Sequence, residues 1–435
     1  MKWCCFRRTS IRQQGAATLL LTTLMISLML FVVGRSALLS RYQLAEVQHE
    51  IERRQSFWLA EGELECLWTQ ARSRHAGETL PSACQQIEHQ VKLVSPQDQQ
   101  LTATVGTTTL QKRYRLPLPD SAGAVKTSSR LILMKQASFA PALARLNTGG
   151  RWQCIALRYK YDFYAPSVST YHPEQLSYPL YSGLPGDSGR CAGSYHSVDL
   201  PAKDAKSDYQ HTPSLSPFRD LFGVAVQDWF QVMSNPQVGR IPQSLNETVN
   251  GQMRYQRAVE LPHSQFNPEC GAQIEDLIWH GKMIIWVYGG CVLSDPDVQR
   301  INIAIQAKFP QQGIIVLIQD GLVGIESHHA LQGMLYQFIS PQHASMEFQR
   351  WGDTTLQAAL TESLTQAPQP NISPEQVSYF QLGSFYPAGG LVLDADRRFA
   401  VVQGRIDFHY RRDLLIQPLS LIRPAQWRGE SWYEP

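Results

Sequence analysis

The stretch from Gly15 to Gly34 constrains the fold of this chain more than any other part of its sequence. Its twenty residues include no ionisable side chain. Because a helix rises about 1.5 Å per residue, this stretch would extend roughly 30 Å, the thickness of the hydrocarbon core of a bilayer. No small-residue cleavage signal follows it. The sequence therefore predicts a retained membrane-spanning helix at residues 16–34.

Basic residues on either side of this stretch predict its orientation. Those that precede it, with no acidic residue among them, are Lys2, Arg7, Arg8 and Arg12. Only Arg35 and Arg41 follow it closely. By the positive-inside rule, this excess predicts a cytoplasmic N-terminus for a helix that crosses the membrane once. We expect everything after Gly34 to face the periplasm or the exterior.

The composition is that of a folded protein. Hydrophobic residues make up 43% and aromatic residues 10% of the 435 positions, which favours a packed core over disorder. The 39 basic residues nearly balance the 37 acidic ones, so we expect no nucleic-acid partner. A chain of this length has room for two or three domains.

The helix is expected to continue beyond the membrane as a stalk at residues 35–76. Between positions 36 and 75 there is no proline and a single glycine, Gly62, among good helix formers. Apolar residues recur there at three- to four-residue spacing and define one face: Leu44, Val47, Ile51, Trp58, Cys66 and Leu67. Gly77 and Pro81 are stop signals. Membrane part and stalk together would form a helix of about sixty residues, roughly 90 Å long.

Beyond the helix the hydrophobic pattern changes to that of strands. Residues 100–118 and 128–135 alternate and are rich in Thr, Val, Leu and Tyr. We expect a β-rich region at 77–235, with a Tyr- and Pro-rich loop and a helix near 217–233. A β-rich C-terminal domain is expected at 236–435.

The C-terminal domain repeats short apolar runs bounded by Gly, Asp or Ser. They are residues 283–288, 301–305, 313–318, 333–338, 389–393, 399–402 and 405–410. Such runs suit strands buried on both faces or the wall of a coil of strands, although no strict sequence repeat is present. A helix is expected within them at 356–365. The predicted fold is α+β: a long transmembrane and stalk helix, then a large β-rich soluble region that is β-solenoid-like at the C-terminus.

Six cysteines follow the membrane-spanning stretch, in the part expected in an oxidising compartment. They are Cys66, Cys84, Cys154, Cys191, Cys270 and Cys291. Six cysteines allow fifteen pairings. Nearest-neighbour bonds, 66–84, 154–191 and 270–291, are favoured because each closes a local loop, and free buried thiols are the alternative. No C-x-x-C pair or zinc-type Cys/His spacing is present, so we expect no metal and no cofactor.

The N-terminus resembles the class III signal sequence that prepilin peptidase reads. A short basic leader, residues 1–15, ends in Gly15, and the apolar helix starts at Ala16. The segment GAATLLLTTLMISLMLFVVGRSALLSRYQLAEVQHEIERRQSFWLAEGELE is similar to the PilX-type minor pilins of type IV pili. In those proteins an Ala-Glu pair lies far along the helix, and here it is Ala60-Glu61. The β-rich tail, with FRDLFGVAVQDW at 218–229 and a closing GRIDFHYRRDLL, is similar in pattern to larger PilX-like proteins.

This resemblance implies a non-enzymatic structural protein of a type IV pilus system. It implies cleavage between Gly15 and Ala16, followed by N-methylation of Ala16. The residues that would pack in the membrane and in the fibre are Leu20, Leu24, Leu28 and Phe31. A low-abundance minor pilin is implied, acting in fibre initiation or at the tip, with adhesion to a surface as a further option. The implied partners are other pilins and minor pilins, prepilin peptidase and the inner membrane.

Position 20 departs from the family pattern. Most pilins begin the mature chain with Phe or Met and place Glu where Leu20 stands here. In the family that glutamate neutralises the amine of a neighbouring subunit, and an unpaired charge there is costly. The largest pseudopilin of type II secretion also lacks it and sits at the tip. Leu20 therefore indicates either a tip or initiating position or an unprocessed leader, and we favour the first.

Two other functions fit the same sequence. One is a signal-anchored periplasmic enzyme, which would keep its N-terminus and contain a polar cleft with clustered titratable groups. The other is a minor pseudopilin of type II secretion. Deletion would separate this last case from a pilin, since loss of a pilin affects pili and loss of a pseudopilin affects enzyme export.

Two sequence motifs suggest chemistry but favour ordinary surface structure. The GDSG segment Gly186–Gly189 resembles the nucleophile loop of trypsin-like proteases. That mechanism needs a histidine base, and no matching histidine segment precedes it. His328 and His329, near Glu326 and His343, would point to opposite faces of a strand, so they are poor joint metal ligands.

Two further sets of residues suggest binding sites. Asp394 and Asp396, like Asp295 and Asp297, lack the ligand series and glycine of a calcium loop. The tyrosine-rich region 159–195 suits a partner-binding surface, because Tyr offers large contact area with a polar tip. A purely structural role, as a strand core with a disulfide-tied loop, is favoured there.

Overall fold

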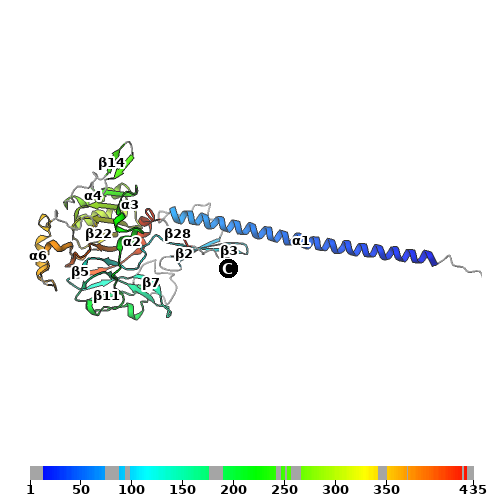
Figure 1. Cartoon of the computed structure of the whole chain (residues 1–435), viewed down its shortest axis with the longest axis horizontal. Coiled ribbons are helices and arrows are strands. Elements are labelled where there is room, and N and C mark those ends of the chain that lie inside the picture. Colours follow the sequence, from blue (N-terminus) through cyan, green and yellow to red (C-terminus); the bar gives the residue numbers. More distant parts are fainter. Residues whose placement is uncertain are drawn as a thin grey trace, which may run out of the picture.

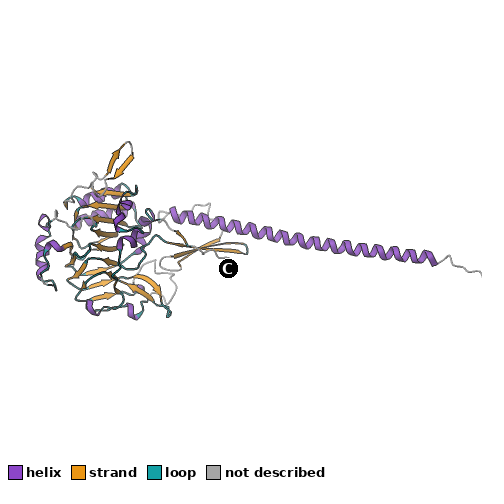
Figure 2. Ribbon diagram, in the orientation of Figure 1, coloured by secondary structure: helices purple, strands orange, loops and turns teal. Residues whose placement is uncertain are grey.

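The structure, a computed structural model, describes most of the chain. The described residues are 13–73, 88–93, 98–175, 190–241, 246–249, 252–255, 266–340, 350–369, 371–423 and 426–428. They form one long helix that projects from a β-rich head carrying several short helices (Figures 1 and 2). The α+β class predicted from the sequence is therefore confirmed.

Helix α1 (Gln13–Ser73) is 61 residues long and leaves the head for most of its length (Figure 1). Every side chain from Ala17 to Gln55 is exposed. The most apolar window within Ala17–Thr69 has a mean hydropathy of 2.3, and none of that window is buried. Among the described residues this is the one helix long and apolar enough to cross a membrane.

The stalk face predicted from the sequence packs only at its far end. Leu44, Val47, Ile51 and Trp58 remain exposed, because the head reaches only the last turns of α1. The residues of α1 that are buried against the head are Ala60, Glu63, Leu64, Leu67 and Trp68. Leu67 is therefore the buried member of the predicted face.

A four-stranded antiparallel sheet connects α1 with the head. Its strands in spatial order are β1 (Glu88–Leu93), β2 (Asp98–Val105), β3 (Thr108–Arg115) and β28 (Gln426–Trp427). Strands β2 and β3 form a hairpin whose turn contains Gly106 with φ +59°, a conformation that favours glycine. Helix α1 packs on β2 and β3, and β28 brings the C-terminal part of the chain beside them (Figure 1).

The head is built on three sheets in which every strand pair is parallel. The first has eight strands, in spatial order β12 (Tyr209–His211), β9 (Leu157–Tyr159), β4 (Val125–Thr127), β25 (Gly390–Asp394), β22 (Gly333–Phe338), β19 (Ile314–Gln319), β17 (Ile284–Tyr288) and β13 (Val238–Ile241). The second has seven: β10 (Phe163–Tyr164), β5 (Arg130–Leu133), β26 (Phe399–Val402), β23 (Val377–Leu382), β20 (Val323–Glu326), β18 (Gly290–Ser294) and β16 (Phe266–Asn267). The third has three: β11 (Val168–Thr170), β6 (Ala137–Phe139) and β27 (Ile406–Phe408).

The chain fills these sheets out of sequence order. It enters the middle of the first sheet at β4, winds through β5, β6, β9, β10 and β11, and reaches one edge at β12. A crossing segment, residues 212–237 with α2 (Pro217–Phe222) and α3 (Trp229–Met233), leads to the opposite edge at β13. From there the chain winds back until β25 pairs with β4. The regions 77–235 and 236–435 therefore contribute strands to the same sheets.

Shorter elements complete the head. The remaining strands form three antiparallel or parallel pairs: β7 (Ala142–Leu146) with β8 (Trp152–Ile155), β14 (Asn246–Val249) with β15 (Gln252–Tyr255), and β21 (Ala330–Leu331) with β24 (Tyr386–Pro387). The remaining α-helices are α4 (Cys270–Trp279), α5 (Asp295–Lys308), α6 (Gln357–Thr365) and α7 (Ile416–Ser420). Helix α6 and its flanking residues cover the outer face of the second sheet.

Strands of the first sheet are buried on both faces. In β19, Ile314, Val316 and Ile318 pack in the cluster between the sheets. Ile315 and Leu317 alternate with them and belong to the outer cluster, which the crossing segment covers. Two-sided burial is what the uninterrupted apolar runs of the sequence predict.

Two elements differ from the sequence-based prediction. Residues 301–305 are not a strand but part of α5, because Ser294 and Asp297 form a capping box that starts a helix there. The helix predicted near 217–233 is interrupted by Gly223, whose φ of +78° ends α2 before α3 begins.

Two disulfides join cysteines that are neighbours in the sequence. Cys154 bonds to Cys191 and Cys270 to Cys291, each with a Cα–Cα distance of 5.6 Å. Both pairings are those favoured from the sequence. Cys66 is also disulfide-bonded, and Cys84, its predicted partner, lies outside the described residues.

Candidate functional site

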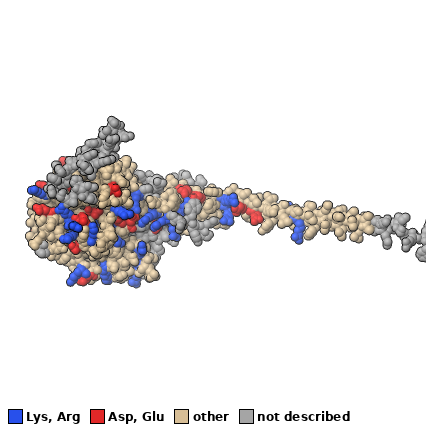
Figure 3. Space-filling model, viewed as in Figure 1, with Lys and Arg blue, Asp and Glu red and all other residues tan. Residues whose placement is uncertain are grey.

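The exposed part of α1 is the first candidate site. Leu20, Leu24, Leu28 and Phe31 are between 60% and 67% exposed. Their spacing of four, four and three residues places them along one side of the helix. Figure 3 shows that this distal part of the helix carries few charged side chains, in contrast to the head. Such a surface is stable in lipid or against other apolar helices rather than in water.

The residues assigned to leader processing lie at the start of α1. Gly15 and Ala16 are within this helix, which begins at Gln13. Residues 1–12 of the predicted leader, with Cys4 and Cys5, lie outside the described part of the chain.

The far end of α1 is fastened to the head by what we call the stalk mount: the end of α1 from Phe57 to Trp68, strands β2 and β3, and Trp427. Trp68 stacks on Trp427 with ring centres 4.1 Å apart and planes at 26°. Tyr114 of β3 meets Trp68 edge-on at 5.5 Å. Aromatic pairs of this geometry contribute about 0.5–1.5 kcal/mol each beyond the burial of their area.

A buried lysine ties the stalk mount together by charge. The Nζ atom of Lys112 donates to Oε1 of Glu61 and to Oε1 of Glu65, both at 2.7 Å. The lysine side chain is 4% exposed, and its Nζ lies 4.9 Å from the centre of the Trp427 ring. Glu61 and Glu65 are four residues apart, so they share one face of α1. Glu61 is the glutamate of the Ala-Glu pair noted in the sequence.

Apolar packing continues from the stalk mount into the head without a break. One cluster of buried residues includes Leu64 of α1, Leu110 of β3, Phe218 of α2 and Tyr336 of β22. The end of α1 and the first sheet are therefore parts of one packed unit.

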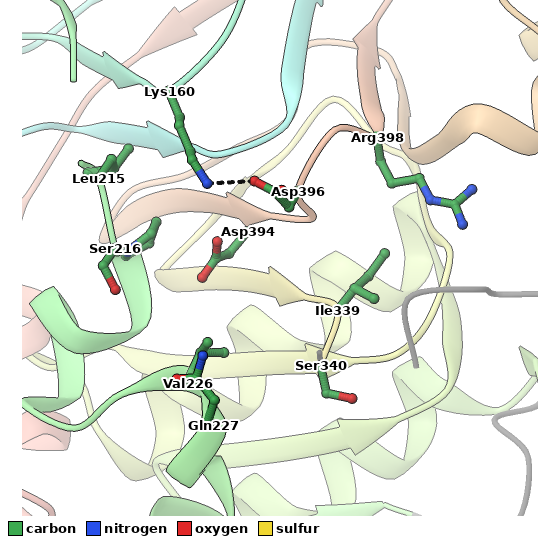
Figure 4. A pocket seen from close by; sticks show the side chains of 11 residues that line it. Lys160, Leu215, Ser216, Val226, Gln227, Ile339, Ser340, Asp394, Asp396 and Arg398 are labelled. Carbon is green, nitrogen blue, oxygen red and sulfur yellow. Dashed lines mark hydrogen bonds and ion pairs between the residues drawn. The ribbon is translucent and has the colours of Figure 1, made fainter. Parts of the chain in front are cut away.

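The second candidate site is a cavity of about 400 Å³, here called the corner cavity, at the corner where the chain turns from the first sheet to the second (Figure 4). Its polar lining residues are Lys160, Ser216, Gln227, Ser340, Asp394, Asp396 and Arg398. They come from three coils of the sheets and from the crossing segment, which closes one side. Residues far apart in the sequence meet here because β25 pairs with β4, which pairs with β9.

Lys160 and Asp396 form an ion pair at the rim of the corner cavity. Nζ of Lys160 donates to Oδ1 of Asp396 at 2.7 Å (Figure 4), and the Tyr161 hydroxyl donates to the same oxygen at 2.8 Å. Desolvation opposes charge on both groups, but the hydrogen bonds outweigh it. The pKa of Lys160 is therefore raised and the pKa of Asp396 is lowered.

Asp394 faces the corner cavity from the end of β25. Its Oδ1 accepts a hydrogen bond from the Ser128 hydroxyl at 2.6 Å, and its Oδ2 accepts one from the Tyr336 hydroxyl at 2.9 Å. Burial raises the pKa of Asp394, and these two hydrogen bonds only partly offset that effect. Neither partner is a cation, which distinguishes Asp394 from Asp396.

A buried polar chain continues from the corner cavity along the same corner. The amide and the hydroxyl of Ser340 donate to Asp320 at 2.6 and 2.8 Å. Gln319 donates to Asp320 at 2.9 Å and accepts from the Trp286 indole at 2.8 Å. These groups are committed to the fold, as buried polar groups usually are.

The histidine and aspartate candidates from the sequence take structural roles. Asp295 accepts hydrogen bonds from the Ser327 hydroxyl and the His328 amide, both at 2.8 Å. His329 lies 3.2 Å from Asp295, and His343 lies outside the described residues. Within the described ranges, no group of three or more His, Cys, Asp or Glu is placed to hold a metal ion.

The tyrosine-rich region contains a strand core tied by a disulfide. Cys154, Cys191 and Trp152 are buried together, and Tyr195 packs against them. The GDSG segment and two of the tyrosines of this region lie outside the described residues.

Two histidines stack in the same region. The His172 and His196 rings lie 3.8 Å apart with planes at 8°. The pKa of His172 is lowered by desolvation and then by the neighbouring His196, and that of His196 is lowered by desolvation.

Sequence reasoning missed Lys112, Trp427 and the corner cavity. The four-residue spacing of Glu61 and Glu65 signals a shared helix face, but nothing in the sequence shows which cation meets it. Trp427 and the cavity depend on contacts between segments separated by hundreds of residues. Comparison with protein-family models, curated proteins and solved structures finds no match for this chain.

Proposed function

We propose that this chain is a pilin-like, non-enzymatic structural subunit of a type IV pilus system, held in the inner membrane by α1 until it is assembled. The observation that carries the proposal is the bare apolar surface of α1, on which every side chain from Ala17 to Gln55 is exposed. Such a helix needs an apolar environment, and lipid and a bundle of other pilin helices both supply one.

The side of α1 that carries Leu20, Leu24, Leu28 and Phe31 is the surface we assign to helix packing. These side chains have no partner within the described head, so they are available both to lipid and to neighbouring subunits. Leu20 lacks a carboxylate, so this subunit cannot neutralise the amine of a subunit that entered the fibre earlier. That favours a position at the tip or in the initiating complex.

The stalk mount supports the same proposal. It buries aromatic, aliphatic and charged groups between α1 and the head, which fixes the head relative to the helix. A fibre subunit needs this rigidity because the packing of its helix then sets the position of its head. The head is large compared with the helix (Figure 1), which favours a low copy number.

The winding of the head is proposed to be that of a β-solenoid. Successive coils pair in parallel through both main sheets, from β13 to β25 and on to β4 and β9 in the first, and from β16 to β26 and on to β5 in the second. An elongated stack of this kind would present a broad surface at a fibre tip, consistent with the option of adhesion.

Co-expression with a prepilin peptidase tests the proposal. We expect the full chain to shift to a smaller apparent mass, and Gly15→Val to abolish the shift. The matched control is Gly34→Val at the other end of the apolar stretch, where an added Cβ atom meets no atom within 4 Å. Absence of any shift in the wild-type protein would favour a signal-anchored enzyme instead. Deletion of the gene then separates a pilin, which affects pili, from a pseudopilin of type II secretion.

A further inference from the structure

The polar groups that line the corner cavity differ in whether they have hydrogen-bond partners within the described part of the chain. Lys160 and Asp396 satisfy each other, and Ser340 is committed to Asp320. In contrast, the Ser216 hydroxyl makes no capping hydrogen bond to α2. Within the described part of the chain, the side chains of Ser216 and Gln227 have no hydrogen-bond partner. The crossing segment therefore offers free donors and acceptors to the cavity.

The opposite wall offers further hydrogen-bonding capacity. Each carboxylate oxygen of Asp394 accepts one hydrogen bond and has a second lone pair left. The Lys160 ammonium has three protons and uses one on Asp396. Polar groups thus converge on one space from both walls, and Figure 4 shows Asp394, Lys160 and Ser216 around it.

The charges around the corner cavity nearly cancel. Lys160 and Arg398 line it with positive charge, and Asp394 and Asp396 line it with negative charge. An anionic ligand would meet two carboxylates, and a cationic ligand would meet the Lys160 ammonium, with the Arg398 guanidinium nearby, where it donates to the Glu375 carbonyl at 2.8 Å. This arrangement disfavours either kind of ion and favours a neutral ligand.

The volume of the corner cavity and its apolar lining restrict the class of possible ligands further. A volume of about 400 Å³ is at the small end of the range of pockets that hold ligands. Leu215, Val226 and Ile339 supply aliphatic surface between the polar groups. A ligand that fits has C–H faces and several hydroxyls that both donate and accept, which describes a single sugar ring.

We propose that the corner cavity binds a neutral, hydroxyl-rich small ligand of the pyranose sugar class, with Ser216 and Gln227 of the crossing segment and Asp394 of β25 as its hydrogen-bonding partners. This site is independent of the pilin-like function, because none of its residues belongs to α1 or to the stalk mount. A failure of one proposal therefore leaves the other standing.

Ligand-observed NMR on the full chain, held in lipid nanodiscs or in a detergent without a sugar headgroup, tests the proposal. The probes are glucose, galactose and mannose, with glucuronate and glucosamine as charged forms of a similar ring. At least one neutral sugar should bind with a dissociation constant of about 1 mM or tighter, and each charged form should bind about tenfold more weakly. Binding of none of the neutral sugars, or preference for a charged form, would overturn the proposal.

Two variants locate the binding. Gln227→Ala and Ser216→Ala should each weaken binding of the best neutral sugar by about five- to tenfold, the effect of one lost hydrogen bond. Gln231→Ala is the matched control, since Gln231 is an exposed glutamine one helical turn further along the same segment. Circular dichroism and thermal unfolding confirm that the variants are folded. Equal binding by Gln227→Ala, Ser216→Ala and wild type would place the sugar elsewhere and contradict the site.

Discussion

The two ends of α1 have apolar side chains of the same kinds in opposite environments. Leu24 near one end is 62% exposed, whereas Leu64 near the other end is fully buried. The head supplies a partner for the last turns only, through the stalk mount. The helix extends well beyond the reach of the head, along a sequence of good helix formers, so contacts with the described head do not set its length. What differs between the two ends is the partner each needs.

The buried end packs against residues of the same chain, whereas the exposed end has no such cover from the described head. At the stalk mount, Lys112 balances Glu61 and Glu65, and Trp427 covers Trp68. At the exposed end the described head offers no such cover. Under the pilin-like proposal this division is expected, because the anchor would move from lipid into the fibre while the head stays attached to it.

The largest expected effect comes from placing charge in the exposed end. Leu24→Arg/Leu28→Arg should abolish stable membrane integration, because two arginines near the centre of a membrane helix cost roughly 5–7 kcal/mol. The matched control is Leu39→Arg/Leu44→Arg, whose leucines are equally exposed, at 60% each. Flotation of membranes after extraction at high pH measures the difference. Equal loss of membrane binding in both variants would mean that the stalk also lies in lipid.

The second-largest effect is expected from a cavity at the buried end of α1. Leu64→Ala should lower the free energy of unfolding by about 2–5 kcal/mol, as large-to-small changes at buried sites do. Leu59→Ala on the exposed side of the same helix, where the leucine is 57% exposed, should change it by less than about 0.5 kcal/mol. Urea unfolding followed by tryptophan fluorescence reports both, since Trp68 and Trp427 stack at this site. Similar values for the two variants would show that the stalk mount does not hold the helix.

A smaller effect is expected from the charge in the stalk mount. Lys112→Met should destabilise the protein by about 2 kcal/mol, because it leaves the largely buried Glu61 without its cation. The loss is below that of a fully buried pair because the Glu65 side chain is 49% exposed. Arg54→Met removes the exposed ion pair with Glu50 and should cost less than about 1 kcal/mol. A stabilised Lys112→Met variant would indicate that desolvation of the lysine outweighs its ion pairs.

The smallest expected effect is a change in the stability of the head with pH. The folded state lowers the pKa of His172 and His196 below the usual 6.5, so it binds fewer protons than the unfolded state at mildly acidic pH. The stability contributed by the two neutral rings is present above that value and is lost as the pH falls through it. Glu174 and Asp208 oppose this effect, and Arg151, Arg190 and Lys206 add to it.

The test is the drop in thermal midpoint from about pH 7.5 to about pH 5, compared between wild type and His196→Phe. The variant keeps the ring stack and removes one titrating group, so its drop should be smaller. A drop of the same size in both proteins would assign the acid sensitivity to other groups.

The long helix and most of the parallel strands are readable from the sequence, because each depends on local pattern. The uncharged stretch from Gly15 to Gly34 predicts a helix, and the apolar run at 313–318 predicts a strand, from the local sequence alone. The prediction of a strand at 301–305 was wrong because so short an apolar segment fits the spacing of a helix as well as that of a strand. The capping box at Ser294 starts a helix there. The order of strands was not readable, since pairing of β25 with β4 joins positions about 270 residues apart. For the same reason the corner cavity, where Lys160 meets Asp396, has no sequence signature.

Mass spectrometry of the mature N-terminus tests the central claim most directly. The protein purified from its native membrane should yield an N-terminal peptide that begins at Ala16 and carries an added methyl group on its amine. A peptide that begins at Met1 or retains the residues before Ala16 would contradict the pilin-like assignment. In that case α1 would be a permanent anchor, and the bare surface that carries Leu20, Leu24 and Leu28 would serve lipid alone.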